Sequence, residues 1–396
     1  MACCDHHRSP VLFDLGPLSA RATDAGLETF YKAIGDPPGG DDDGIWKPHH
    51  SPFVQRLIEE FTKRGLKRLA DILEDLSGLA ASRGKPKGPP PEKMMGRWAP
   101  NRIAEVKQYL DNKPVEQYTF DDWMRAVDWI VQRYLPAGAS KTEAEWLAYR
   151  ATLMAQVQKR MGEITERQAG DILAAIPEAA ADPHAAMGSL TKLQAAAIEY
   201  GQAHCSELIV ALTDAMRHKI KQTILANQNA TYLGEKAPNL QTLLFDEFAE
   251  LNRDWRRIAV TEAGEMMNQG LIASVQPGTK VQRVEMYDAC PFCAKIHGRI
   301  LTVVDPGSKN KDGENEVWVG KTNVGRSASP RKRVGDILVE REPDELWWVA
   351  AGVQHPHCRG NWIVMEGPKE AKEDDLAKFE RELMAKLRAM KPDREA

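Results

Sequence analysis

The sequence has neither a long apolar run nor a large excess of one charge. Its apolar stretches, such as 208–212 and 347–351, fall far short of the roughly 20 residues that a transmembrane helix needs. The N-terminal sequence MACCDHHRSP contains no apolar core of a secretion signal. Lys and Arg total 53 and Asp and Glu total 57, which gives a net charge of −4. These absences argue against a membrane protein, a secreted protein and a polycation that coats nucleic acid.

Cysteine is also scarce, with six residues in a chain of 396, too few for a disulfide-stabilised scaffold. Cys205 lies in a helical pattern of apolar residues and is expected to be a buried, unreactive thiol. Cys3 and Cys4 lie in a leader where such clusters are usually incidental. The other three fall in the C-terminal half and carry most of the functional information: Cys290, Cys293 and Cys358.

The N-terminal part contains one clear helical pattern between two linker-like stretches. Apolar residues from Val54 to Leu76 recur at helical spacing, and charged residues fill the opposite face. Residues 36–44 combine Pro, Gly and Asp, and residues 83–91 form a basic, proline-rich stretch. We therefore predict that residues 1–96 form an extension with one amphipathic helix and flexible linkers.

Helical patterns also dominate the next part of the chain. From 97 to 237 apolar residues repeat at helical spacing, and we predict a helical domain with these bounds. Ser140 and Glu143 have the spacing of a capping box that would begin one of its helices. One more helix is predicted from 242 to 274, because the breaker sequence Gln-Pro-Gly follows shortly after it.

The apolar pattern changes from helical to alternating after this last helix. The stretches that predict strands are 281–286, 300–304, 317–319, 337–339, 347–349 and 362–364. Interleaved acids and bases predict a charged helix over 367–396. The expected fold class is therefore α+β, mostly α: a long helical body followed by a small, loop-rich α+β module.

Two short motifs in this module have the spacing of metal ligands. Cys290 and Cys293 form a Cys-x-x-Cys pair, and His355 and Cys358 repeat that spacing near the end of the module. The Cys-x-x-Cys turn brings two thiolates together, and zinc prefers four such ligands in a tetrahedron. A closed Cys3His zinc site would join both ends of a module whose short strands bury little surface.

Spacing alone leaves other interpretations of these residues open. A lone Cys-x-x-Cys pair can be a redox centre, although no strand–CxxC–helix pattern of the thioredoxin kind surrounds it. The spacer between the two pairs is longer than in ordinary zinc fingers. His297 and His357 are further candidates for the fourth ligand, with a polar surface position as the simpler interpretation of each.

The cysteine motifs and the preceding helix together resemble a known family. The Cys-x-x-Cys pair, the downstream Gly298 and the closing His-Pro-x-Cys-Arg are similar to the C-terminal module of phage Mu F-like minor head, or head morphogenesis, proteins. Thr261 and Glu262 follow Ile-Ala-Val as in the family's Ile-Ala-x-Thr-Glu helix, and Asn268 matches its later asparagine. The resemblance covers about a third of the chain, and we place the module at 238–366.

The sequence departs from the family pattern at one position. That pattern ends in Cys-Arg-Cys, whereas Gly360 stands at the last position here. If the last cysteine is a ligand in relatives, His357 could compensate for it in this chain. The resemblance therefore supports Cys290, Cys293 and Cys358 as metal ligands more firmly than His355.

The resemblance implies a structural rather than an enzymatic role. Proteins of this family act in head assembly, associate with the portal vertex and are present in few copies per particle. The expected partners are the portal protein, the major capsid or scaffolding protein and, as a further option, packaged DNA. The expected location is the phage head, assembled in the host cytoplasm. A closed zinc site, moreover, leaves no open coordination position for catalysis.

A basic stretch in the module has two interpretations. It could touch DNA or an acidic portal surface, and the simpler interpretation is a flexible, solvated loop. The cations concerned are Arg326, Arg331, Lys332 and Arg333.

Two smaller features of the module are interpreted from their chemistry. Thr261 and Glu262 are expected to anchor their helix to the zinc module through hydrogen bonds. The sequence Gly320-Lys-Thr lacks the earlier glycine of a phosphate-binding loop, because Asn315 stands there, and we do not expect nucleotide binding.

The expected function is thus that of a minor head protein of a tailed phage or prophage. The alternative from another class is a cytoplasmic zinc-dependent nucleic-acid-binding or redox protein. A third is an effector or toxin enzyme that uses a phage-like module for delivery. Zinc content separates the structural from the redox interpretation, because a redox pair need not hold metal.

Overall fold

The structure is a computed structural model that describes residues 46–81, 103–162, 164–176, 191–365, 381–383 and 385. The two predicted linkers and almost all of the predicted C-terminal helix lie outside the described residues. The fold class is as predicted: mostly α, with strands only in a small, loop-rich α+β part near the C-terminus.

The long helices come first along the chain, and the strands follow, with one short helix after the first strand and one 3-10 turn after the fifth. The helices are α2 (Pro52–Ala81), α3 (Ile103–Asp111), α4 (Phe120–Tyr134), α5 (Ala139–Met161), α6 (Glu166–Ala175), α8 (Lys192–Tyr232), α9 (Leu240–Ser274) and α10 (Pro291–Ile296), with 3-10 turns η2 (Val115–Gln117) and η3 (Pro343–Glu345). The strands are β1 (Lys280–Val284), β2 (Ile300–Val303), β3 (Glu316–Val317), β4 (Arg331–Val334), β5 (Ile337–Glu340) and β6 (Asn361–Val364).

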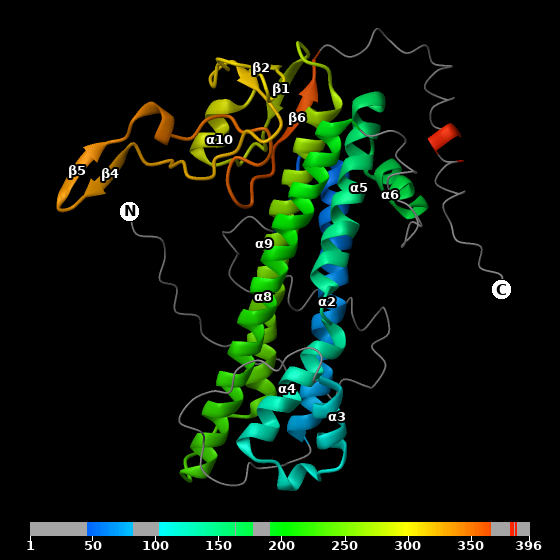
Figure 1. Ribbon diagram of the computed structural model, residues 1–396, viewed down its shortest axis with the longest axis vertical. Coiled ribbons are helices and arrows are strands. Elements are labelled where there is room, and N and C mark those ends of the chain that lie inside the picture. Colours follow the sequence, from blue (N-terminus) through cyan, green and yellow to red (C-terminus); the bar gives the residue numbers. More distant parts are fainter. Residues whose placement is uncertain are drawn as a thin grey trace.

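Four long helices, α2, α5, α8 and α9, pack side by side into an elongated bundle (Figure 1). The shorter α3 and α4 lie at one end of this bundle, and the strands lie at the other. The α9 helix extends the length of the bundle and reaches the strands, so the helix that carries the Thr-Glu motif also belongs to the helical body.

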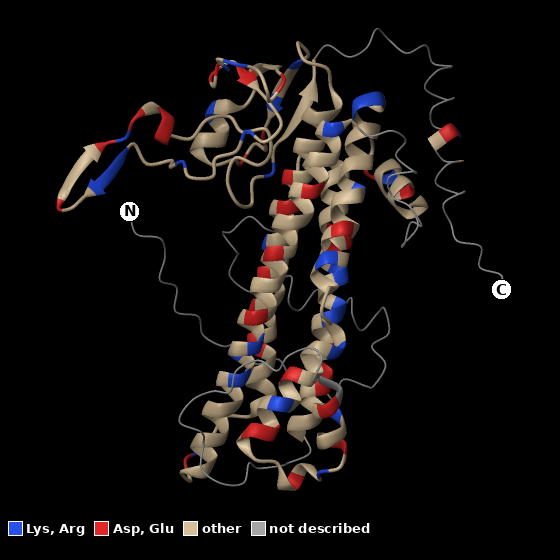
Figure 2. Ribbon diagram, in the orientation of Figure 1, with Lys and Arg blue, Asp and Glu red and all other residues tan. Residues whose placement is uncertain are grey.

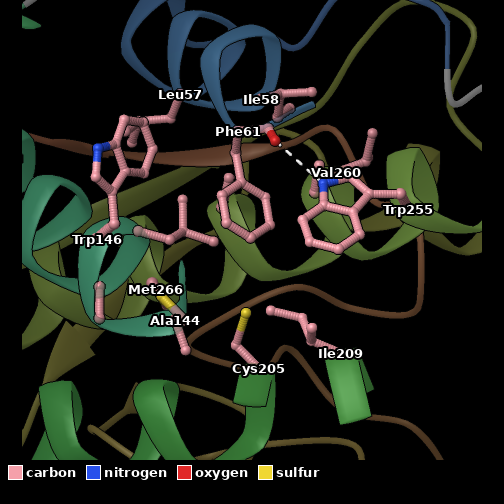
Figure 3. Close-up of a cluster of buried hydrophobic side chains, with 14 of the residues drawn as sticks. Leu57, Ile58, Phe61, Ala144, Trp146, Cys205, Ile209, Trp255, Val260 and Met266 are labelled. Atoms are coloured by element: carbon pink, nitrogen blue, oxygen red, sulfur yellow. Dashed lines mark hydrogen bonds between the residues drawn. The ribbon is translucent and has the colours of Figure 1, made fainter. Parts of the chain in front are cut away.

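The α2 helix lies before the boundary expected at residue 96, yet it shares one core with the helices that follow. Its buried Phe61 packs between Trp146 of α5 and Trp255 of α9, with ring centroids 6.2 Å and 5.5 Å away (Figure 3). The Trp255 indole N–H donates to the backbone oxygen of Phe61 at 3.1 Å. Aromatic rings bury large apolar areas, so this cluster ties α2 to the bundle.

The predicted capping box at the start of α5 is wrong. The residue before the helix is Gly138, which has the positive φ of 91° that glycine adopts without strain, and no side chain caps this end. Glu143 is fully buried instead, and it accepts hydrogen bonds from Arg64 and Arg68 of α2. A buried carboxylate requires such partners, and they come from a part of the chain that the local pattern cannot reveal.

The α+β part contains a four-stranded sheet and a separate hairpin. The strand order in the sheet is β3-β2-β1-β6, with β1 antiparallel to both neighbours and β2 parallel to β3. The predicted strand at 347–349 is wrong, because its backbone groups bond the loop side chain of Asn323 and the backbone of Ser327. Conversely, the residues of β4, expected in a solvated loop, pair with β5 in an antiparallel hairpin.

A buried lysine holds the long loop of this part. The Lys321 ammonium donates to the carbonyl oxygens of Gly313 and Glu316 at 2.8 Å and 2.6 Å. It also lies about 5 Å from the ring centroids of Trp318 and Trp348, within the range of a cation–π interaction. The fold thus occupies the Lys321 side chain with carbonyl and ring contacts. Among the described residues, no helix combines the length and apolar character that a membrane span requires.

Candidate metal centre

The two cysteines of the Cys-x-x-Cys pair lie at the start of α10. Cys290 is the residue before the helix, and its sulfur accepts the backbone N–H of Cys293 at 3.5 Å. Pro291 takes the first helical position, where its missing N–H has no cost. This local geometry turns both thiols to the same side. His355 and Cys358 come from the loop before β6, where the N–H of Cys358 donates to the carbonyl of His355.

The side chains of Cys290, Cys293 and His355 converge on one point. The His355 Nε2 lies 3.3 Å from the Cys290 sulfur and 3.2 Å from the Cys293 sulfur. A tetrahedral zinc ion would separate sulfur from nitrogen by about 3.6 Å and two sulfurs by about 3.8 Å. The observed spacing is therefore close to that of a metal-binding set.

The orientation of His355 suits a metal ligand. Its Nδ1 lies 2.7 Å from the carbonyl oxygen of Pro356, which can only accept, so Nδ1 carries the proton. The Nε2 lone pair then faces the two thiols, the arrangement in which metal-binding histidines are held by an outer hydrogen bond. The ring also stacks on Trp347 at 5.7 Å and 12°.

Cys358 belongs to a second, overlapping triad. Its sulfur lies 3.9 Å from that of Cys293 and 3.8 Å from the Glu285 carboxylate. Cys293 is common to both triads. The four residues predicted from sequence thus come together with Glu285 in one cluster that could hold a metal ion, but in two triads rather than one closed tetrahedron. Sequence reasoning missed Glu285, because nothing in its position just after β1 points to the cysteines.

Arg283 supplies a fixed positive charge to the second triad. It is completely buried, and its guanidinium donates to Glu285 at 2.6 Å and to the Cys358 sulfur at 3.2 Å. The hydrogen bond from Cys293, together with this guanidinium, lowers the pKa of Cys358 well below its usual value, and the same bond raises the pKa of Cys293. Burial raises the pKa of Glu285 to about 7, against the opposing effect of Arg283.

The departure from the family pattern at Gly360 has a structural explanation. A Cβ atom placed on Gly360 would overlap the carboxylate of Glu285. Glycine therefore leaves the space that Glu285 fills, and this acidic side chain, from the residue after β1, lies where a side chain at position 360 would point. The two remaining histidine candidates lie outside both triads: His297 Nδ1 accepts the N–H of Glu285, and the His357 N–H donates to Thr261.

The α9 helix is bonded to the loop that carries Cys358. Thr261 accepts the backbone N–H of His357 at 3.2 Å. Asn268 donates to the carbonyl of Gly360 at 3.1 Å and accepts the N–H of Trp362 at 3.3 Å. These bonds join the Thr-Glu helix to the cysteine loop across about ninety residues of sequence.

The expectation that Glu262 also bonds the module is wrong. This carboxylate, 1% exposed, turns to the neighbouring helix and lies 3.1 Å from His204 Nδ1 on α8. Its other oxygen has no hydrogen-bond partner in the described part of the chain. Residues one apart on a helix point about 100° apart, so Thr261 and Glu262 cannot face the same neighbour.

Replacing Asn268 by leucine should destabilise the protein by about 2–6 kcal/mol, because two buried backbone groups lose their partner at about 1–3 kcal/mol each. Asn252 on the same helix is a matched control, since it is fully buried and its amide has no hydrogen-bond partner in the described ranges. Asn252→Leu should be neutral or stabilising. Urea unfolding of both variants tests this, and equal midpoints would contradict the anchoring role of Asn268.

The ion pair between His204 and Glu262 should make stability depend on pH. The hydrogen bond to Glu262 raises the pKa of His204 above 6.5, and Glu265 and Glu207 add to this against burial. The pair therefore stabilises the fold below pH 6.5, and this contribution is lost as the pH rises through the raised pKa. His204→Gln should be less stable than the parent in acid, with the difference shrinking in alkali. His218→Gln, an exposed change on the same helix, should show no such trend in thermal unfolding scans.

The four cations proposed to contact DNA or the portal do not form one patch. Arg326 donates to the carbonyl of Leu346 and lies 3.4 Å from the Trp348 ring centroid, so it is part of the module's own packing. Lys332 pairs with Glu345. Arg331 and Arg333 are exposed on β4. Two of the four thus remain as surface cations, on a hairpin rather than a loop.

Comparison with known proteins adds no further assignment. No protein-family model, curated protein or solved structure matches this chain. The geometry and the motifs themselves are therefore the basis for a functional conclusion.

Proposed function

We propose that this chain is a minor head protein of a tailed phage or prophage, acting in head morphogenesis at the portal vertex. The observation that carries the proposal is the meeting of the two motifs on which the family resemblance rests. The Thr-Glu helix and the cysteine loop are far apart in sequence, and Thr261 and Asn268 bond that loop directly. A chance match of either motif would not require this contact.

The metal of the cluster is proposed to be zinc, in a structural role. Two or three thiolates with one neutral imidazole form a donor set that zinc prefers over harder cations. Glu285, Cys293 and Cys358 are all buried, so a metal held by this triad has little access to a substrate. The ion would fix α10 of the module to the loop before β6, which Asn268 in turn bonds to the helical bundle. We propose no enzymatic activity.

The proposed partners are the portal protein and the major capsid or scaffolding protein, with packaged DNA as a further option during packaging or ejection. The elongated bundle offers its flanks to these partners, and the α+β part lies at one end of it (Figure 1). The proposed location is the phage head, assembled in the host cytoplasm.

Quantitative mass spectrometry of gradient-purified proheads and virions tests this proposal. We expect the chain in few copies per particle, in a fixed ratio to the portal protein. A host cytosolic protein serves as the control for contamination. Absence of the chain from both proheads and virions would end the proposal and leave the cytoplasmic zinc-dependent nucleic-acid-binding or redox protein. The zinc content of the purified chain then distinguishes the zinc-dependent nucleic-acid-binding protein from the redox protein, because a redox pair need not hold metal.

A further inference from the structure

The β4–β5 hairpin extends away from the rest of the α+β part (Figure 1). Its two strands pair with each other, and no described residue adds a third strand on either side. Gly335, with φ of 61°, makes the tight turn between them. A two-stranded sheet alone is only marginally stable in water, so a hairpin that stands free of the body gains stability from a partner.

The end of the hairpin is apolar and exposed. Val334, Ile337 and Leu338 are 57%, 68% and 61% exposed, so large apolar side chains gather around the turn. Single exposed apolar residues are ordinary, but a cluster on an open strand is a surface on which other chains pair.

The two edges of the hairpin, with which no other described strand pairs, differ in charge. The β4 strand carries Arg331, Lys332 and Arg333, and it is basic along its length (Figure 2). The β5 strand has the sequence Ile-Leu-Val-Glu, with its single charge, Glu340, at one end. Charged residues on an edge strand prevent pairing with another chain. The β4 edge has this protection, and the β5 edge lacks it.

The ladder register shows which backbone groups are free on the β5 edge. Arg341 N–H donates to the carbonyl of Pro330, and Val339 lies opposite Lys332. Because hydrogen-bonded pairs alternate in an antiparallel ladder, the N–H and C=O of Leu338 and Glu340 point away from β4. The edge therefore offers donors and acceptors at the spacing of a pairing strand.

We propose that β5 pairs in an antiparallel manner with β5 of a second copy of this chain, to form a four-stranded sheet β4-β5-β5-β4. Charge selects the β5 edge, and not the β4 edge, for pairing between two copies. Antiparallel pairing of β5 with itself places the two Glu340 carboxylates at opposite ends, whereas pairing of two β4 strands would set six cations against one another. The two basic β4 strands then form both outer edges and end the sheet, which gives a closed two-fold dimer. This inference does not depend on the proposed function.

The test is the molar mass of the full-length chain by light scattering over a concentration series. The parent should approach twice the monomer mass as concentration rises. Leu338→Pro should remain monomeric, because proline removes the outward N–H that the pairing uses. Arg333→Pro is the matched control: Arg333 lies directly opposite Leu338 and its N–H points out of the β4 edge, so this variant perturbs the hairpin equally but should still dimerise.

Each other outcome overturns the inference. A parent that stays monomeric at the highest concentration shows that the edge does not self-associate. A Leu338→Pro variant that still dimerises places the interface elsewhere. Equal loss of dimer in both proline variants shows that association depends on the hairpin as a whole and not on the outward N–H of Leu338, which contradicts pairing through the β5 edge.

Discussion

Replacing Cys293 by serine should abolish metal binding, whereas Cys290→Ser should only weaken it. The reason is that Cys293 belongs to both triads and its loss leaves each with two ligands, while loss of Cys290 leaves the triad of Glu285, Cys293 and Cys358 intact. Structural zinc contributes a binding free energy of about 10–16 kcal/mol in small zinc domains, and part of it is folding free energy. The Cys293 variant should therefore also unfold at a lower temperature, and its unfolding should no longer respond to a chelator.

Metal content per chain by mass spectrometry and thermal unfolding with and without EDTA measure this effect. Cys205→Ala is the matched control, because Cys205 is also fully buried but lies in the helical bundle, outside both triads. It should bind metal like the parent. A Cys293→Ser chain that keeps its metal, or a parent that binds none after incubation with zinc, would refute the metal site.

Replacing Gly65 by alanine should destabilise the protein by about 2–4 kcal/mol. A Cβ atom at this position of α2 would overlap the Trp255 indole, which is 1% exposed and hydrogen-bonded to Phe61 (Figure 3). Overpacking of a core costs about 1–3 kcal/mol, and displacement of the indole adds about 1 kcal/mol for the lost hydrogen bond. The indole cannot move easily, since the Phe61 ring packs against it and it lies inside the buried core.

Gly78 provides the control for this substitution within the same helix. A Cβ atom there would meet no other atom within 4 Å. Gly78→Ala should therefore stabilise the protein by up to about 1 kcal/mol, because alanine favours the helix over glycine. Urea unfolding followed by tryptophan fluorescence measures both variants. Effects of the same sign would show that helix propensity, and not the contact with Trp255, decides the result.

The metal cluster shows how far sequence reasoning extends. The spacing of Cys290, Cys293, His355 and Cys358 identified residues that do come together, because short turns with two ligands have recognisable patterns. Glu285 and Arg283 could not be found in this way. They enter the cluster because antiparallel pairing of β1 with β6 places Arg283 opposite Trp362 beside the cysteine loop, a matter of register between distant strands.

The errors in the helical body and in the hairpin have a similar origin. Glu143 was expected to cap its own helix, but the neighbouring α2 offers Arg64 and Arg68, and a buried carboxylate binds the stronger partners. The β4 residues carry three cations and look like a solvated loop, yet the tight turn at Gly335 lets them pair with β5. In both cases a partner elsewhere in the fold, α2 for Glu143 and β5 for β4, determined a structure that the local pattern did not predict.

The sequence by itself determined most of the helices, most of the strands and four residues of the cluster that could hold a metal ion. These features depend on the spacing of side chains along a few turns or one strand, which the order of residues records directly. Only the tertiary structure decided that α2 belongs to the bundle, that Glu262 faces α8, and that Glu285 fills the space beside Gly360. Such contacts join residues far apart in the chain, and close packing of the core selects them rather than any local pattern.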